Sequence, residues 1–166
     1  MIRQKLCYKA IILGLILLSS CDKIHKNENI RIFPKGKVKS LNELMNLNEL
    51  KSKVLYINIW TPGSEPCLEE FARFGQLKKQ LSDHEIKFIF ITPRGNRQWE
   101  KTIYQYDVEG WHIQSIELIK DVLKNTNQLY QYPILLLAAK DRTITRLDIR
   151  APYRVKERVD QIKKLL

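Results

Sequence analysis

Two apolar runs of strand-forming residues, separated by one amphipathic helix pattern, constrain the fold of this chain most. Residues 54–60 and 86–92 are rich in Ile, Phe, Val and Tyr. Between them, apolar side chains recur at helical spacing, at Leu68, Phe71, Phe74, Leu77 and Leu81. Strands that are apolar along their whole length are typical of sheets buried on both faces. The pattern therefore predicts a β-α-β unit with helices covering both sides of its sheet.

The rest of the chain continues this α/β pattern. Leucines at three-residue spacing over residues 41–50 predict a short helix or turn, and two more helix patterns cover residues 99–106 and 116–123. Residues 134–139 and 143–149 predict two strands of a hairpin, and residues 155–166 predict a last helix. With a hydrophobic share of 44%, the composition is that of an ordinary globular domain. We therefore predict an α/β domain over residues 38–166, with a central mixed sheet.

The N-terminus has the composition of a targeting segment. Residues 1–20 contain Arg3, Lys5 and Lys9, no acidic residue, and an apolar run of about 9 residues, whereas a membrane-spanning helix needs about 20. The run ends in Leu18-Ser19-Ser20-Cys21, which resembles the bacterial lipobox. This resemblance implies that residues 1–20 are a lipoprotein signal peptide and that Cys21 is lipidated. An uncleaved signal anchor or an ordinary secretory signal are the alternatives.

A lipidated Cys21 would place the domain in the bacterial cell envelope, outside the cytoplasm, anchored to the inner or outer membrane. Residues 21–37 are polar and include Pro34 and Gly36, so we interpret them as a tether. Without the three basic residues of the signal, 26 basic residues stand against 18 acidic ones, a net charge of +8 for residues 21–166. This charge favours contact with anionic headgroups. The chain has no arginine-rich arm or recognition motif, so nucleic acid is not an expected partner.

The cysteine count limits the chemistry of the mature protein. Cys7 lies in the signal and Cys21 is the predicted lipidation site, which leaves Cys67 as the one free thiol. The fold therefore has no intramolecular disulfide. With one thiol and three histidines in the domain and tether, we expect no metal site and no cofactor.

The junction between the first predicted strand and its helix carries a motif. Residues 57–71, INIWTPGSEPCLEEF, resemble the active-site segment of thioredoxin-like proteins, especially the membrane-tethered TlpA/ResA branch of thiol:disulfide oxidoreductases. Trp60, Pro66, Cys67 and Glu70 match the pattern. Ser64 stands where this family has its first, nucleophilic cysteine.

Two features further along the chain support the resemblance. Tyr132-Pro133 precedes a predicted strand where the family has a cis-proline beside its active-site cysteines, and the isomer is not readable from sequence. Residues 139–144 resemble the family's last hairpin, with Arg142 where a glycine is usual. The resemblance covers residues 37–166 and implies a three-layer thioredoxin-like sandwich, with an inserted helical segment at about residues 98–124.

The altered motif does not support dithiol exchange, because the Ser64 hydroxyl is far less acidic than a thiol. We therefore predict a binding or accessory role, with an envelope protein or a thiol partner as the candidate partner. The resemblance assigns six residues to the lining of the site: Trp60, Ser64, Glu65, Pro66, Tyr132 and Pro133. Cys67 itself is either a buried small hydrophobic residue or a redox-active thiol. In the buried reading, Ser64 caps the following helix.

An enzymatic alternative uses Cys67 alone. Ser64-x-x-Cys67 also resembles the core motif of peroxiredoxins, whose thiolate needs a cationic neighbour. Candidates for that neighbour in the sequence are Arg142, Arg146 and Arg150. His112 is either a general base for the thiol or a structural residue beside Trp111. A serine hydrolase based on Ser64 is disfavoured, since the chain has no G-x-S-x-G elbow.

Overall fold

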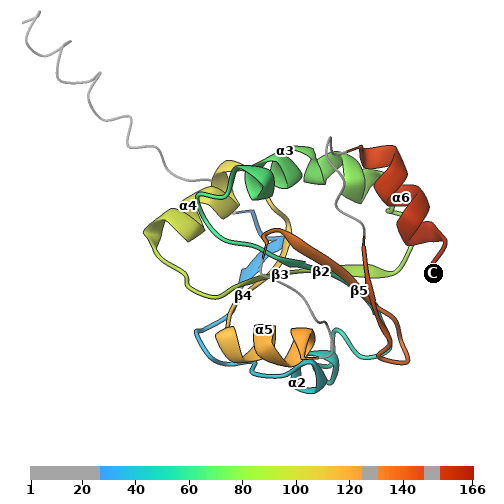
Figure 1. The fold of residues 1–166 in the computed structure, drawn as a ribbon, viewed down its shortest axis with the longest axis horizontal. Helices are drawn as coiled ribbons and strands as arrows, with labels where there is room; N and C mark the ends of the chain where they lie inside the picture. Colours follow the sequence, from blue (N-terminus) through green and yellow to red (C-terminus); the bar gives the residue numbers. More distant parts are fainter. Residues whose placement is uncertain (1–26, 125–130, 148–153) are drawn as a thin grey trace, which may run out of the picture.

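The computed structural model describes residues 27–124, 131–147 and 154–166. The predicted signal peptide at residues 1–20, Cys21 and the first part of the tether lie outside these residues. The described chain forms one six-stranded mixed sheet between two layers of helices (Figure 1). In chain order, the elements are β1 (Ile30–Ile32), α2 (Leu41–Met45), β2 (Val54–Ile59), α3 (Glu65–Gln80), β3 (Ile86–Thr92), α4 (Arg97–Gln105), β4 (Gly110–Gln114), α5 (Ile116–Leu123), β5 (Ile134–Ala138), β6 (Ile144–Arg146) and α6 (Val155–Lys163).

The strand order is β1-β4-β3-β2-β5-β6. The first four strands of this order run parallel, β5 is antiparallel to β2, and β6 is antiparallel to β5. In the centre, Ile59 at the end of β2 lies opposite Ile91 of β3 on one side and Ile134 of β5 on the other. The C-terminal end of β2 and the N-terminal end of β5 therefore meet at the same end of the sheet.

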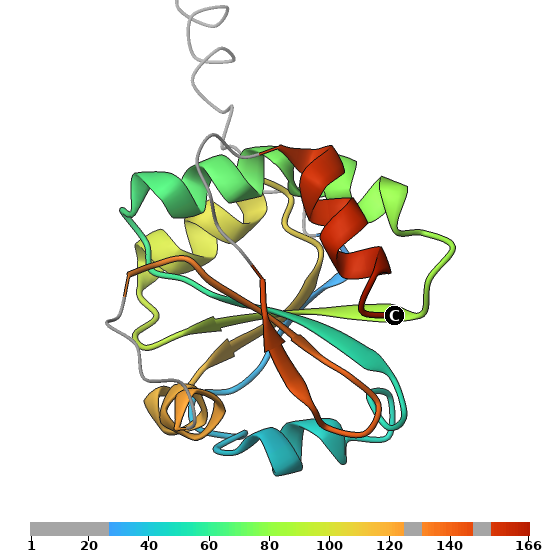
Figure 2. The ribbon, with the colours of Figure 1, turned by 45° about the vertical axis from the view of Figure 1, so that its right-hand side comes forward.

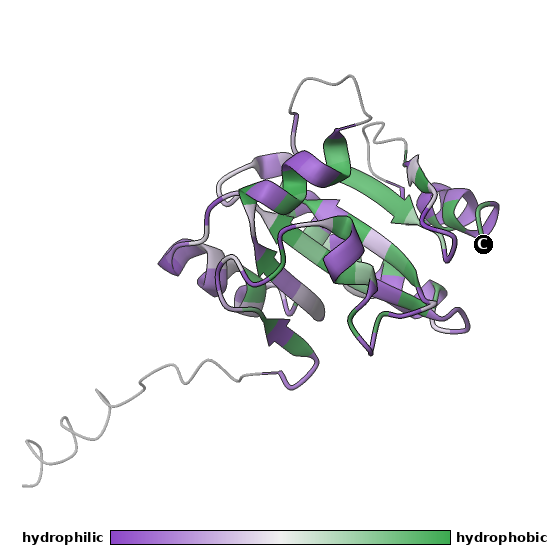
Figure 3. Ribbon diagram, turned by 90° about the horizontal axis from the view of Figure 1, so that it is seen from below, coloured by the Kyte–Doolittle hydropathy of each residue, from purple (hydrophilic) through white to green (hydrophobic). Residues whose placement is uncertain are grey.

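The helices cover the sheet on both faces. Helices α3, α4 and α6 lie on one face, and α2 and α5 lie on the other (Figures 1 and 2). Each face has its own buried cluster, one built around Phe71, Phe74 and Phe90, the other around Leu55, Ile57 and Ile89. Figure 3 shows the hydrophobic strands inside and hydrophilic faces on the outer helices. The structure confirms the predicted α/β class, the β-α-β unit and the C-terminal hairpin.

Two strands and one boundary differ from the sequence-based expectation. The segment expected to be helical at about residues 98–124 contains β4 between α4 and α5. Strand β4 pairs with β1, which lies in the segment expected to be a tether. Ile30 and Phe33 are also buried, so the folded domain includes residues before the predicted boundary at 38. A three-residue strand and a five-residue strand with mixed polarity are too short to give a clear periodicity.

No helix within the described residues is both long and apolar enough to cross a membrane.

Gly110 is the glycine that the fold requires most clearly. Its φ of +140° is one that side-chain-bearing residues rarely adopt, and an added Cβ would lie 2.7 Å from the carbonyl oxygen of Phe88. Gly75, within α3, has no atom within 4 Å of such a Cβ apart from its chain neighbours and the backbone of its own helix. The two glycines therefore form a matched pair for one test.

Gly110→Ala should lower the free energy of unfolding by roughly 1–3 kcal/mol, because it adds both backbone strain and a clash at the start of β4. Gly75→Ala should leave that free energy unchanged or raise it by up to about 1 kcal/mol, since alanine is the better helix former. Urea unfolding followed by tryptophan fluorescence measures both. Equal effects of the two substitutions would contradict the assigned role of Gly110.

Candidate functional site

The β2–α3 junction is held to the sheet by Trp60. Its backbone N–H donates to the carbonyl of Ile91 at 2.9 Å, which continues the β2–β3 pairing by one residue. The Trp60 side chain is fully buried, and its ring meets the ring of Phe71 edge-on at 4.6 Å. Gly63 then turns the chain with a φ of +84°. Helix α3 starts directly afterwards, with Pro66 tolerated in its first turn.

Ser64 occupies the N-cap position of α3, but its side chain does not cap the helix. Its backbone carbonyl accepts hydrogen bonds from the N–H groups of Cys67 and Leu68, at 3.0 and 3.1 Å. The Ser64 side chain instead acts on the Cys67 thiol and lowers its pKa. The capping bond that one reading of Ser64 required is therefore absent.

Cys67 is fully buried and is a free thiol. Burial raises the pKa of the Cys67 thiol above its ordinary value, and the negative charge of Glu70 adds to this rise. Hydrogen bonds from the Ser64 side chain and the Thr61 backbone lower the pKa, but by less. The thiol form is therefore favoured at neutral pH, and the sulfur has no exposed surface.

Glu70 and Arg158 form a buried ion pair between α3 and α6. A carboxylate oxygen of Glu70 lies 3.5 Å from a guanidinium nitrogen of Arg158, and the two side chains are 5% and 4% exposed. Burial raises the pKa of Glu70 to about 7, while the charges of Arg158 and Arg73 oppose the rise. The motif identified Glu70 in the sequence. Nothing in the sequence pointed to Arg158, since arginines on amphipathic helices are usually exposed.

The loop that contains Tyr132 and Pro133 lies next to this junction, at the same end of the sheet. The Tyr132-Pro133 peptide bond is cis. Because Ile134 pairs with Ile59, Pro133 and Trp60 lie next to the ends of neighbouring strands. Tyr132 packs partly against the buried clusters of both faces. The structure thus brings all the predicted lining residues to one end of the sheet. There, Glu65 and Pro66 are exposed, whereas Trp60 and Pro133 are buried.

The other candidates from the sequence lie elsewhere. Arg142, with a φ of +72°, binds the side-chain oxygens of Asn42 and Asn46, at the helix layer opposite α3. Arg146 is on the edge strand β6, separated from β2 by β5. Arg150 lies outside the described residues. No described arginine named as a candidate is among the charges that act on the Cys67 thiol.

His112 is a structural residue. It is fully buried on β4, two strands away from β2, and its ring stacks on Phe90 at 4.9 Å. Its Nε2 atom lies 2.7 Å from the carbonyl oxygen of Val108. Burial lowers the pKa of His112 to about 4, so the ring is neutral at physiological pH. Across the described ranges, no three histidine, cysteine or carboxylate side chains gather in a way that could hold a metal ion.

Comparison with solved structures identifies the fold as thioredoxin-like. The thioredoxin domain of a thiol-disulfide oxidoreductase from Bacteroides vulgatus matches 72% of this chain and 83% of its own length, with a TM-score of 0.57 and 17% identity. A thiol-disulfide oxidoreductase from Bacteroides fragilis matches 74% of this chain and 88% of its own length, with a TM-score of 0.57 and 20% identity. A thioredoxin-family thiol:disulfide interchange protein from Chlorobium tepidum matches 69% of this chain and 80% of its own length, with a TM-score of 0.56 and 16% identity.

The sequence itself shows no such match. No family model and no curated protein sequence matches the chain. At identities of 16–20%, the structural neighbours establish the shared fold.

The buried carboxyl of Glu70 should make stability depend on pH. Its pKa rises from 4.5 in the unfolded chain to about 7 in the fold, so the folded state binds this proton more tightly. The resulting stabilisation is complete below about pH 4.5 and is lost as the pH rises through about 7. We expect a loss on the order of 2–3 kcal/mol across this window.

Glu70→Gln, which cannot ionise, should remove this part of the pH dependence. Urea unfolding of both proteins at pH 5 and pH 8 measures it, and the difference between the two pH slopes isolates Glu70 from other titrating groups. The substitution also leaves Arg158 without its carboxylate, so lower stability at both pH values is expected. The same pH slope in both proteins would contradict the assignment.

Proposed function

We propose that this protein is a lipid-anchored, thioredoxin-like protein of the bacterial cell envelope with a binding or accessory role rather than dithiol exchange. The observation that carries the proposal is the arrangement at the start of α3, where Ser64 occupies the N-cap position and the Cys67 thiol, one turn further on, is fully buried. The motif resemblance relates the chain to the TlpA/ResA branch. Ser64 stands in the place of that branch's nucleophile.

Dithiol exchange needs two thiols that react one after the other. One thiolate attacks the substrate disulfide, and a second thiol resolves the mixed disulfide by intramolecular attack. A helix N-terminus favours the first thiolate electrostatically, yet a hydroxyl at the same place stays protonated at neutral pH. Cys67 lacks both the exposure for attack and a partner thiol among the described residues.

The binding role rests on the β2–α3 loop and the loop before β5, which lie together at one end of the sheet. Gly63, Glu65 and Pro66 are exposed, and Tyr132 is partly exposed beside the cis-proline. In the family that the motif resembles, the corresponding loops lie beside the substrate. We infer that these loops contact a protein partner in the envelope, through shape and backbone groups rather than through a covalent step.

The envelope location rests on the lipobox resemblance at Cys21. One solved structure with the same fold is that of a secreted disulfide oxidoreductase from Mycobacterium tuberculosis, which matches 69% of this chain and 84% of its own length, with 17% identity and a TM-score of 0.53. A lipid anchor on Cys21 would hold the domain at the inner or outer membrane, facing away from the cytoplasm.

The second candidate function is single-thiol chemistry at Cys67, by reaction with peroxide or by a mixed disulfide with a thiol partner. The hydrogen bond from Ser64 favours it, because such a bond stabilises a thiolate. Two features oppose it, namely the burial of the sulfur and the neighbouring negative charge of Glu70. We therefore place it second.

Ser64→Cys tests the proposal directly, since it restores the two-cysteine spacing without changing the rest of the site. We expect the wild-type protein and a matched Ser64→Ala variant to show no turnover in a disulfide-reduction assay with insulin and dithiothreitol. The Ser64→Cys variant should gain measurable turnover. The wild type, Ser64→Ala and Cys67→Ala should consume peroxide at the background rate. Turnover or peroxide consumption by the wild type above the Cys67→Ala level would favour the second candidate instead.

A further inference from the structure

The described chain enters the domain at one particular end of the sheet. Asn27, just before β1, donates hydrogen bonds from its side-chain nitrogen to the carboxylates of Asp107 at 2.8 Å and Glu109 at 3.1 Å. These two acidic residues immediately precede β4, which runs parallel to β1. The entry point is therefore fixed at the N-terminal ends of the parallel strands.

The candidate site lies at the opposite end. Strand β2 runs parallel to β3, and so parallel to β4 and β1. Ser64 and Cys67 follow the C-terminal end of β2, and Pro133 precedes the first residue of the antiparallel strand β5 at the same end. The six residues of β2 alone separate the two ends by about 20 Å.

The tether between membrane and domain is short. This step rests on the lipid anchor at Cys21 in the proposed function. Five residues lie between Cys21 and Asn27, and even a fully extended chain covers about 20 Å over the six steps from one Cα atom to the other. A domain of about 140 residues has a radius of gyration of about 14 Å, or a diameter of roughly 37 Å. Such a tether is too short to let the domain turn over freely above a membrane.

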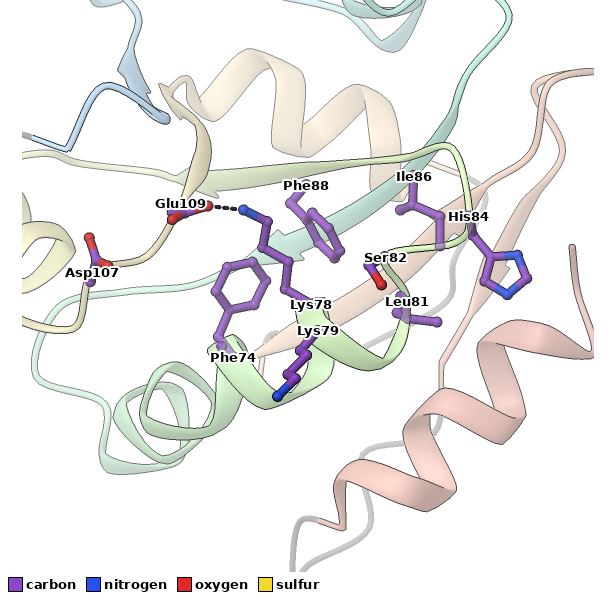
Figure 4. Close-up of a pocket in the computed structure, with 11 residues that line it drawn as sticks. Phe74, Lys78, Lys79, Leu81, Ser82, His84, Ile86, Phe88, Asp107 and Glu109 are labelled. Atoms are coloured by element: carbon purple, nitrogen blue, oxygen red, sulfur yellow. Dashed lines mark ion pairs between the residues drawn. The ribbon is translucent and has the colours of Figure 1, made fainter.

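The end of the domain at the entry point has a surface suited to lipid headgroups. It bears a pocket of about 480 Å³ between the last turns of α3 and the segment before β4 (Figure 4). Phe74 and Phe88 contribute apolar walls, and the pocket is also lined by basic residues and by the acidic residues Asp107 and Glu109. Figure 4 shows the Lys78 amine directed at Glu109, with which it forms an ion pair.

More lysines gather at the same end. Lys53, just before β2, pairs with Glu85 at 2.7 Å, and the positive charges of Lys87 and Lys140 also act on this carboxylate. Lysines near a membrane surface are attracted to anionic headgroups, by about 1 kcal/mol each close to the surface.

We propose that the end of the domain carrying Asn27 and this pocket lies against anionic lipid headgroups, so that the candidate site points away from the membrane. The occupant of this surface is the lipid bilayer itself. A partner of the Ser64–Cys67 site then approaches from the aqueous side, without entering the layer of headgroups.

Energy transfer to headgroup-attached acceptors tests this orientation in the full-length protein. A donor dye is attached through Ser82→Cys at the pocket end or through Glu65→Cys at the site end, both exposed positions. The lipoprotein is reconstituted in vesicles of phosphatidylethanolamine and phosphatidylglycerol. Wild-type protein taken through the same labelling reports any dye on buried Cys67. We expect at least twofold more efficient transfer from position 82 than from position 65.

Three further arms make the result decisive. Inserting 20 Gly and Ser residues between Lys26 and Asn27 should remove most of the difference, because the longer tether lets the domain turn. Vesicles of phosphatidylcholine alone should reduce the difference, because the lysines then face no anionic headgroups; an unchanged difference would overturn the role of headgroup charge. Equal transfer from both positions, or more from position 65, would overturn the orientation. The proposed anchor fails instead if mass spectrometry finds no lipid on Cys21 of the wild type, and if the wild type partitions between vesicles and solution as Cys21→Ser does.

Discussion

The packing of α3 on the central sheet determines what the candidate site can do. Phe71 meets Trp60 at 4.6 Å and Phe90 at 5.6 Å, edge-on in both cases, and Phe74 makes similar contacts with Phe88 and Phe90. Four residues before Phe71, Cys67 lies on the same helix face. The rotation of α3 that buries the aromatic rings therefore also buries the sulfur. A reactive Cys67 would require α3 to move away from its own core.

The same constraint divides the site into an outer and an inner part. Ser64, at the start of the helix, is where the positive end of the helix dipole would favour an anion, but its hydroxyl does not ionise. Cys67 can ionise, but it lies inside, near the negative charge of Glu70. Glu70 is itself turned inward and paired with Arg158 of α6. The fold is thioredoxin-like, and within the described residues no thiol lies at the exposed start of α3.

Much of this could be predicted from the sequence where the pattern was long and apolar. The predicted strand at residues 86–92 coincides with β3, and the Leu68-to-Leu81 pattern falls on α3. Strands β1 and β4 were missed because each is short and interrupted by polar residues. The Glu70–Arg158 pair is a long-range contact that periodicity does not encode. One reading of Ser64 was an N-cap of α3, and only the structure shows that its side chain makes no capping bond.

The alkylation rate of Cys67 in the folded protein tests the central claim most directly. Iodoacetamide modification would be followed by mass spectrometry across pH and urea concentration, with Cys67→Ala as the blank. The account predicts almost no modification of the native protein, and modification in urea that follows the unfolding curve. Rapid modification without urea, with a pH midpoint below the ordinary thiol value of 9.0, would contradict it.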